Sequence, residues 1–327
     1  MEIVEAMGKH RVYDSARKVF SSLRDIQNTL VSIHPDYSNS YIVPISSKNY
    51  LHYTSITLKK SNLYVLRTPL ISMGTWEALA RKVPMCIIEE YFLRNTPKDS
   101  VVKMLLFPFR NVPFISFTKR THAFLNSLKI NSFLIPPAVQ KSKGAKIRKH
   151  ILYVGRIEET KNPRLFLKLA KAFPNEVFVM IGKGSMSDQL KKESDMLHNL
   201  KFISFLKQRK NLFQYYSEAK LLIHPAIQDP IALVIIEALS TQTPVLASFG
   251  AGASDFLPKK WILDPLVESD WINKTKAILE HQKEAISEAE QIFKKEHLDI
   301  ADPYFEKVSD ELLLLLKLRW PELFKKK

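Results

Sequence analysis

The C-terminal half of the chain alternates short apolar runs with longer amphipathic stretches. Short apolar runs indicate buried strands, and apolar residues spaced three or four apart indicate helices that pack one face on a core. Strands that alternate with helices in this way are typical of a parallel, doubly wound sheet. The pattern predicts strands at 150–154, 176–181, 201–205, 221–224 and 244–248, helices at 162–173, 187–199, 211–219 and 231–240, and charged helix beyond 264 that ends at 311–318.

The N-terminal half shows a similar alternation with less regular spacing. We therefore expect an α/β protein whose two halves share one Rossmann-like architecture. The predicted strands are 2–7, 28–33, 40–44, 63–66, 85–88, 114–117 and 133–135, and the predicted helices are 11–26, 75–81 and a helix that runs through 125.

A cationic segment at 141–149, without any acidic residue, separates the two halves. Its polarity and lack of periodicity indicate an interdomain linker, and a basic tail that binds nucleic acid is the alternative. The predicted domains are therefore 1–146 and 147–302, with a C-terminal helix at about 303–327 that packs back on the first domain.

Charge and composition narrow the class of protein. The net charge is +16, and residues 1–146 hold 21 Lys and Arg against 9 Asp and Glu. A field of this sign attracts nucleic acid, a phosphorylated substrate or an anionic membrane face. No apolar run reaches the ~18 residues that span a bilayer, and no apolar signal-peptide core is visible at the start.

The chain has a single cysteine, Cys86, within an apolar run. We expect it to be a small buried hydrophobe in a protein of a reducing compartment. Together with the soluble composition, this predicts a cytoplasmic protein, and a peripheral position on the inner face of the membrane is the alternative.

Candidate chemistry lies where the predicted C-terminal strands end. Ligands of doubly wound sheets bind at the carboxyl ends of the strands. A diphosphate leaving group develops negative charge there, which fixed cations, backbone amides and a helix N-terminus stabilise. A carboxylate on the same helix could accept ribose hydroxyls. The residues at these positions are Gly155, Arg156, Lys161, Gly182, Gly184, Leu206, Asp229, Glu237, Gly250 and Gly252.

Several of these segments resemble motifs of family 4 glycosyltransferases. Val154-Gly155-Arg156-Ile157 followed by Lys161-Asn162 is similar to the opening motif of that family's C-terminal domain. The stretch from Asp229 to Leu239 resembles its E-x7-E motif. The resemblance covers roughly residues 130–257.

The resemblance implies a GT-B fold, in which two Rossmann-like domains face a cleft, and a retaining hexosyltransferase that needs no metal. It implies that Arg156 and Lys161 stabilise the diphosphate and that Glu237 binds ribose. Asp229 would face the donor sugar, and the backbone near Leu206 would lie by the base.

This sequence departs from the motif at three positions. Asp229 replaces the first Glu and is one methylene shorter, and Pro230 and Ala232 replace glycines that allow close backbone approach. A purely structural interpretation is open for Asp229 as a helix N-cap, and for Gly182 and Gly184 as turn glycines.

Acceptor-side candidates come from the first half, where the resemblance is faint. Gly8 and Lys9 follow the first predicted strand, and Glu89 and Glu90 follow the strand at 85–88. The acceptor stays open among a glycan, a lipid-linked compound and a protein. Basic amphipathic stretches at 13–26 and 101–114 could contact an anionic membrane, although each has the pattern of a core-facing helix.

The leading hypothesis is a retaining glycosyltransferase that takes a nucleotide-diphosphate sugar as donor substrate and uses no cofactor. The sequence has no Asp-x-Asp pair of the kind that holds a divalent ion on a diphosphate, so no metal ligands are assigned. One alternative is a non-enzymatic protein that binds nucleic acid or an anionic membrane through its basic half. Another is a degenerate family member that binds nucleotide without turnover.

Overall fold

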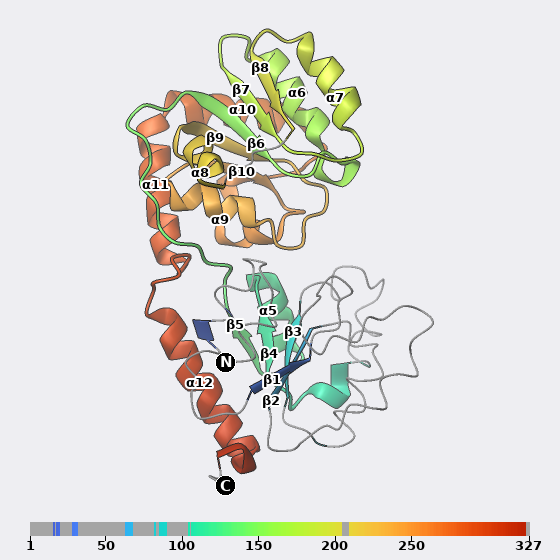
Figure 1. Ribbon diagram of the computed structural model, residues 1–327, viewed down its shortest axis with the longest axis vertical. Helices are drawn as coiled ribbons and strands as arrows, with labels where there is room; N and C mark the ends of the chain where they lie inside the picture. Colours follow the sequence, from blue (N-terminus) through green and yellow to red (C-terminus); the bar gives the residue numbers. More distant parts are fainter. Residues whose placement is uncertain are drawn as a thin grey trace. The chain divides into compact units, whose positions relative to one another are not determined.

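The computed structural model describes residues 16, 18–19, 28–31, 63–67, 82, 85–89, 104, 106–204 and 209–324. The chain divides into two compact units, one formed by residues 1–137 with 302–327 and the other by residues 138–301. Figure 1 labels their helices and strands. Both units are built on parallel sheets, so the predicted α/β class is confirmed.

The C-terminal unit is a six-stranded parallel sheet with the strand order β11-β10-β9-β6-β7-β8. The chain starts in the middle of the sheet, moves to one edge, and then returns to the other side of the first strand. The order therefore reverses between β6 and β9, which is the switch point where doubly wound sheets bind ligands. The strands are β6 His150–Val154, β7 Phe178–Ile181, β8 Leu200–Ile203, β9 Ala219–His224, β10 Val245–Ser248 and β11 Ile262–Leu263.

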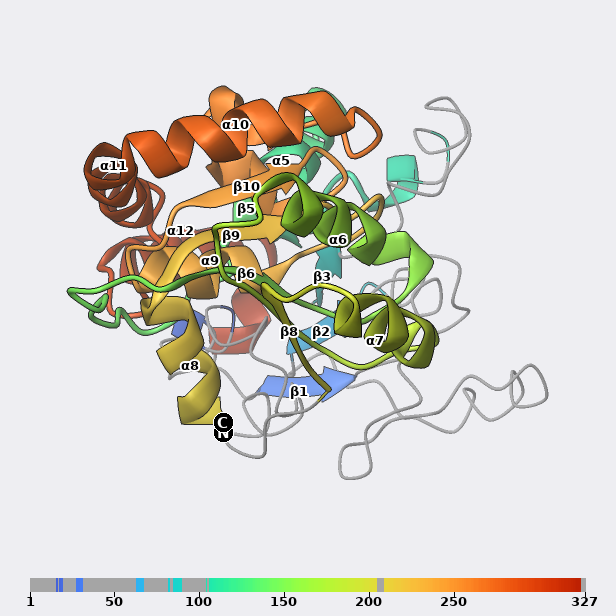
Figure 2. The same cartoon turned by 90° about the horizontal axis from the view of Figure 1, so that it is seen from above.

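Helices follow the strands of this unit as the sequence predicts. Pro163 opens α6, where a missing N–H costs nothing, and Phe166 on its buried face packs against Tyr153 and Phe178. Figure 2 shows α10 and α8 on opposite sides of strands β6 and β9. The helices are α6 Pro163–Ala172, α7 Ser187–Asp195, α8 Arg209–Ser217, α9 Leu233–Ser240, α10 Glu268–Glu280 and α11 Gln282–Lys295.

The described strands of the N-terminal unit form a five-stranded parallel sheet in the order β1-β2-β3-β4-β5. Cys86 in β3 is fully buried, as predicted, and burial raises the pKa of its thiol far above the usual range. The predicted elements at 2–7, 40–44 and 75–81 lie outside the described residues. The strands are β1 Asn28–Val31, β2 Leu63–Arg67, β3 Met85–Glu89, β4 Phe114–Ser116 and β5 Ser132–Leu134, and α5 Lys119–Ser127 joins the last two.

The C-terminal helix α12, Tyr304–Arg319, is part of the N-terminal unit. Its Tyr304 hydroxyl donates to the Leu134 carbonyl at 2.6 Å. The Ser309 hydroxyl donates to the Val19 carbonyl at 2.7 Å. The chain therefore returns to its first sheet after it completes the second. No helix among the described residues is long and apolar enough to span a bilayer.

The segment at 141–149 is not the linker that its composition suggests. The backbone amides of Ser142, Ala145 and Lys149 donate to carbonyls of α9, α8 and the turn after α8. The division between the units falls earlier, between 137 and 138, instead of the predicted 146. Polar, cationic residues are frequent in linkers, but here their backbone groups are bonded to the C-terminal unit.

Arg148 is the main side-chain anchor of this segment. Its guanidinium donates to the carbonyls of Ala219, Thr241 and Gln242 at 2.9, 3.0 and 3.1 Å, and to the Thr243 hydroxyl at 2.6 Å. Burial lowers the pKa of Arg148 to about 10, which leaves the side chain charged at neutral pH. One planar cation thus satisfies the polar groups at the end of α9 and the start of β9.

We expect Arg148→Met to lower the free energy of unfolding by about 2–3 kcal/mol, because several buried acceptors lose their donor while most of the packing volume stays. Urea unfolding followed by circular dichroism measures this change. The control is Arg164→Met, which removes an exposed pair with Glu193 and should cost below about 1 kcal/mol. Equal losses in the two variants would contradict a buried anchoring role for Arg148.

Candidate functional site

The segment after β6 supplies the first part of the site. β6 is buried along its whole length, and its last residue is followed by Gly155 and Arg156. A short 3-10 helix, Glu159–Lys161, then turns the chain before α6. This turn places Lys161 inward, so that the side chain is only 7% exposed. A lysine this enclosed needs partners for its ammonium group.

The loop after β9 supplies those partners. Its path is fixed by backbone hydrogen bonds to both neighbouring loops. The Gln228 amide donates to the Thr160 carbonyl at 3.1 Å, and the Asp229 amide donates to the Gly250 carbonyl at 3.1 Å. The loops after β6, β9 and β10 are thereby connected at the carboxyl edge of the sheet, with the switch point between the first two.

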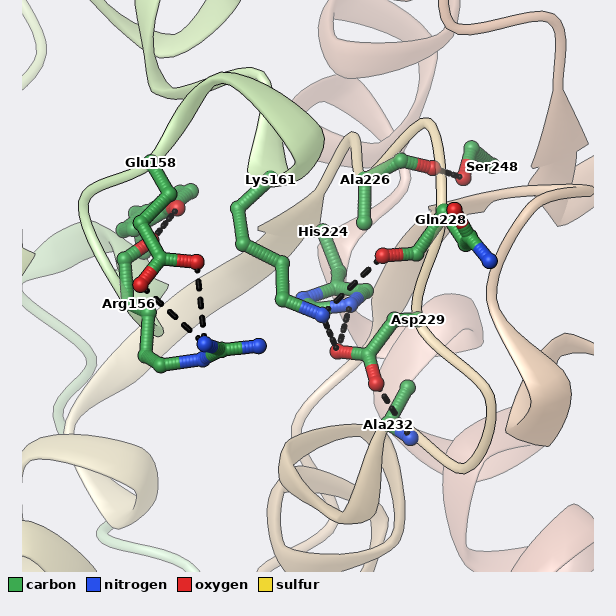
Figure 3. Close-up of polar contacts among 10 residues, drawn as sticks. Arg156, Glu158, Lys161, His224, Ala226, Gln228, Asp229, Ala232 and Ser248 are labelled. Carbon is green, nitrogen blue, oxygen red and sulfur yellow. Dashed lines mark hydrogen bonds and ion pairs between the residues drawn. The ribbon is translucent and has the colours of Figure 1, made fainter. Parts of the chain in front are cut away.

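Lys161 and Asp229 form an ion pair across the switch point (Figure 3). Lys161 Nζ lies 3.0 Å from Asp229 Oδ2 and donates to the Gln228 carbonyl at 3.0 Å. An ammonium group has three N–H donors, and the contacts among the described residues use two of them. The cation is therefore held in place and can still bind an anion.

His224 completes this group of contacts, and its part in the site was not predicted from the sequence. The ring is 2% exposed, and its Nε2 lies 3.1 Å from Asp229 Oδ2. The other oxygen, Oδ1, accepts from the Ala232 amide at 3.1 Å, which fixes the turn that leads into α9. The N-cap interpretation of Asp229 is therefore wrong, because α9 begins at Leu233 with Ala232 as its N-cap residue, and no side chain among the described residues caps it. A polar residue at the end of an apolar strand was the signal that could have pointed to His224.

The pKa of the Asp229 carboxyl lies well below its usual range. Burial by itself would raise it. The hydrogen bond and charge of His224, together with the charge and hydrogen bond of Lys161, outweigh that effect and lower the pKa. Asp229 therefore stays ionised through the physiological range and keeps Lys161 paired.

Arg156 lies beside this group on a more open surface. Its side chain is 67% exposed and pairs with Glu158, with Nη1 at 3.0 Å from Oε2. In Figure 3 the guanidinium extends toward the side on which Lys161 and Asp229 lie. The pair with Glu158 was not predicted, and at this exposure it is weak enough to exchange for a phosphate group. The structure thus brings Arg156, Lys161 and Asp229 to one edge of the sheet.

Glu237 lies one turn into α9 and is buried. Its Oε2 accepts a hydrogen bond from the Tyr216 hydroxyl at 2.9 Å. Burial and the charge of Glu237 raise the pKa of Tyr216 well above its usual value, so the phenol keeps its proton and donates. The acid therefore has a partner on α8, which the sequence did not reveal, and its predicted contact with ribose stays a prediction.

Three of the predicted glycines are needed because neighbouring backbones approach them closely. A Cβ at Gly182 would collide with the Gly155 carbonyl, one at Gly184 with the Ile157 carbonyl, and one at Gly250 with the Ile227 carbonyl. Gly155 itself has room, since a Cβ there would lie 3.4 Å from the Tyr153 hydroxyl. The structural interpretation of Gly182 and Gly184 therefore accounts for their identity without a ligand.

Gly252 opens a short 3-10 helix after β10, and its amide donates to the Asp229 carbonyl at 2.8 Å. Among the acceptor-side candidates, Glu89 is the last residue of β3 and its backbone pairs with Ser116, while its side chain lies outside what the structure describes. Gly8, Lys9, Glu90 and Leu206 also lie outside the described residues, so their roles stay predictions.

Ala232 occupies a left-handed backbone conformation with φ 57° and ψ 55° at the N-cap of α9. The related motif has glycine at this position. A side chain in this conformation costs about 1–2 kcal/mol, because its Cβ crowds the following carbonyl. The departure from the motif is thus accommodated without a change of backbone, at the expense of local strain.

We expect Ala232→Gly to raise the free energy of unfolding by about 0.5 kcal/mol, since relief of the left-handed strain exceeds the added entropy of the unfolded chain. Chemical denaturation at neutral pH measures the difference. Ala238→Gly, in the interior of the same helix, is the matched control and should lower stability by about 1 kcal/mol or more. A comparable loss at both positions would show that Ala232 is not strained.

We expect Asp229→Asn to lower the free energy of unfolding by about 3 kcal/mol at neutral pH, because Lys161 loses its buried counterion. A depressed carboxyl pKa contributes stability that is present above the unfolded value of about 3.9 and is lost as the pH falls toward the folded value. The difference in free energy of unfolding between wild type and variant should therefore decrease below about pH 4, as urea unfolding measured across pH will show.

The control for this substitution is Asp195→Asn, at an exposed position in α7, which should change stability by less than about 0.5 kcal/mol. If the difference in free energy of unfolding between wild type and Asp229→Asn stayed constant down to pH 2, the carboxylate would not be stabilised by its neighbours.

Comparisons with known proteins agree on the C-terminal unit. Residues 137–289 match the family model described as glycosyl transferases group 1. A sulfoquinovosyl transferase of Arabidopsis thaliana is 25% identical over 152 residues, which are 45% of this chain and 29% of that protein. D-inositol 3-phosphate glycosyltransferase of Mycolicibacterium smegmatis is 28% identical over 153 residues, which are 43% of this chain and 35% of that protein. The matched part is thus about a third of the length of these relatives.

Solved structures show the same fold over more of the chain. A sucrose-phosphate synthase from Thermosynechococcus elongatus has a TM-score of 0.64 at 14% identity, and the match covers 93% of this chain and 91% of that one. The Anabaena protein HepE, in complex with UDP, has a TM-score of 0.60 at 10% identity over 90% of this chain and 100% of that one. The neighbours are GT-B glycosyltransferases, so the fold is that of this class. Residues 137–289 of this chain are thus similar to the glycosyl transferases group 1 family.

Proposed function

We propose that this protein transfers a sugar from a nucleotide-diphosphate sugar to an acceptor, with retention of anomeric configuration and without a metal ion. The observation that carries the proposal is the Lys161 ammonium, which Asp229 and Gln228 hold at the switch point while its third N–H has no acceptor among the described residues. Phosphate oxygens are the acceptors that suit a preoriented ammonium beside an accessible guanidinium.

The surroundings of Lys161 supply further stabilisation for a diphosphate. Arg156 can exchange its exposed partner Glu158 for two phosphate oxygens in a bidentate contact. α9 begins directly after the Asp229 loop, and its N-terminus adds a partial positive charge on the same side. Groups that are fixed before the reaction stabilise the charge of the leaving phosphate as it develops.

In the proposed reaction the bond between the anomeric carbon and the donor phosphate oxygen breaks, while a bond from the acceptor oxygen forms on the same face of the sugar. The acceptor proton passes to the departing phosphate oxygen, so no protein nucleophile is required. The role of the chain is to bind the diphosphate and lower the energy of its charge, through Arg156 and Lys161. Glu237 is proposed to bind ribose hydroxyls, and the residues near Leu206 are proposed to lie by the base.

The matched proteins support a nucleotide-sugar donor. One solved structure with this fold is an Escherichia coli protein bound with UDP-2-fluoro glucose, at a TM-score of 0.62 and 14% identity, over 84% of this chain and 80% of that one. Uridine diphosphate is therefore the first probe for this chain. The acceptor is proposed to be a glycan, a lipid-linked compound or a protein, and a cytoplasmic site with peripheral contact to an anionic membrane stays a proposal.

A second candidate function is a protein that binds nucleotide without turnover. It is favoured by the differences from the family motif at Asp229, Pro230 and Ala232. The hypothesis of a protein that binds nucleic acid or a membrane is less favoured, because the Lys161 ammonium at the switch point is enclosed and suited to a small anion. A basic surface that binds polyanions would lose affinity steeply with salt.

We expect Arg156→Ala to weaken the binding of uridine, guanosine or adenosine diphosphate at least tenfold, or about 1.4 kcal/mol, in calorimetry without divalent metal. Loss of a bidentate phosphate contact is the reason. Arg164→Ala, which removes an exposed arginine on α6, is the control and should bind as wild type does. Equal affinity in Arg156→Ala and wild type would remove Arg156 from the site.

We expect Glu237→Ala to abolish nucleotide binding as well, while Tyr216→Phe, which removes only the hydrogen bond to Glu237, should keep it. Melting temperatures of both variants report whether the fold is intact. If the two substitutions weakened binding equally, Glu237 would act by holding Tyr216 and not by holding ribose. A screen of nucleotide-sugars for hydrolysis then separates a transferase from a protein that only binds.

A further inference from the structure

His224 is the last residue of β9, the strand next to β6 at the switch point. It lies among buried apolar residues, and its side chain is 2% exposed. A buried imidazole loses hydration at both nitrogens, so its retention there calls for a specific contact. That contact is with Asp229 Oδ2, at 3.1 Å from Nε2.

The two ring nitrogens of His224 have unequal surroundings. Nδ1 is enclosed and has no hydrogen-bond partner among the described residues, whereas Nε2 faces a carboxylate oxygen. A proton on Nε2 is bonded, and a proton on Nδ1 would be buried without an acceptor. The ring therefore donates to Asp229 through Nε2.

Asp229 accepts from at least three donors on its two oxygens. Oδ2 takes His224 Nε2 and Lys161 Nζ, and Oδ1 takes the Ala232 amide. These contacts to both oxygens prevent rotation of the carboxylate. A side chain one methylene shorter than glutamate keeps this group close to its own backbone and to Lys161.

We propose that His224 and Asp229 are positioning residues that aim the Lys161 ammonium at the donor diphosphate, and that the Asp229 carboxylate does not hold the donor sugar. This rests on the proposed function. Lysine has a flexible four-carbon stem and a strongly hydrated head, so it binds an anion tightly only when its orientation is already fixed. His224 fixes Asp229, Asp229 fixes Lys161, and the third N–H of Lys161 is the one that reaches the phosphate.

Two amide substitutions of His224 test the first step. In glutamine the amide nitrogen is separated from Cβ by the same number of bonds as Nε2 of histidine, and in asparagine by the same number as Nδ1. His224→Gln thus keeps a donor toward Asp229. His224→Asn places the donor near the position of Nδ1, which has no hydrogen-bond partner in the described part of the chain. Both variants bury one neutral amide, so they form a matched pair.

Calorimetry with uridine diphosphate is the measurement, alongside the melting temperature of each ligand-free variant. We expect His224→Asn to bind uridine diphosphate about tenfold more weakly than wild type, because one charge-assisted hydrogen bond is lost. The affinity of His224→Gln should stay within about twofold of wild type. If both variants bound uridine diphosphate as wild type does, His224 would be only a structural residue. The same conclusion would follow if both variants bound it more weakly in proportion to a lower melting temperature.

Asp229→Glu tests the second step. If the carboxylate anchors Lys161, the longer side chain should disturb the ion pair. The affinities for uridine diphosphate and for UDP-glucose should then fall by the same factor. If it holds the sugar, glutamate should change the affinity for UDP-glucose while that for uridine diphosphate stays as it was. The second result would overturn the proposal for Asp229.

If wild type bound none of the three nucleoside diphosphates, the proposed function and this inference would fall together. If wild type bound uridine diphosphate and His224→Asn bound it equally well, only the positioning role would be wrong.

Discussion

The Lys161–Asp229 ion pair is the contact on which the arrangement of this site depends. It joins the loop after β6 to the loop after β9, and so closes the place where the strand order reverses. A buried ammonium without this carboxylate would be strongly unfavourable, and a buried carboxylate without the ammonium equally so. Each loop therefore needs the other in order to keep its own conformation. The same pair provides an oriented cation at the edge of the sheet where parallel α/β proteins bind ligands.

Close packing of the loops explains the residues around this pair. Gly182, Gly184 and Gly250 lie where another backbone leaves no room for a side chain. Ala232 keeps a left-handed conformation that glycine would adopt more easily, because the Asp229 carboxylate accepts a hydrogen bond from the Ala232 amide. The loops at this edge are thus shaped first by contacts with each other. A ligand would meet a surface that is already formed, which lowers the entropy lost on binding.

The elements of the C-terminal unit could be predicted from the sequence because each has a strong local signal. Buried strands are apolar runs, and α6 has an apolar stripe with proline at its first turn. The segment at 141–149 was predicted wrongly as a linker, because its composition is local while its hydrogen bonds go to residues some 70 to 100 positions later. The partners of His224 and Glu237 were missed for the same reason: a hydrogen bond to Asp229 or Tyr216 leaves no mark in the pattern of either side chain.

By itself the sequence determined the fold class, the succession of strands and helices, and the presence of Arg156, Lys161 and Asp229 at the ends of the right strands. These follow from periodicity and from residue type, which are properties of short stretches of chain. Only the tertiary structure decided which of these groups are bonded to each other, because the strand order brings β6 next to β9 across about 65 intervening residues. Pairing, burial and the lowered pKa of Asp229 arise from that approach, so they belong to the folded protein and not to any segment of it.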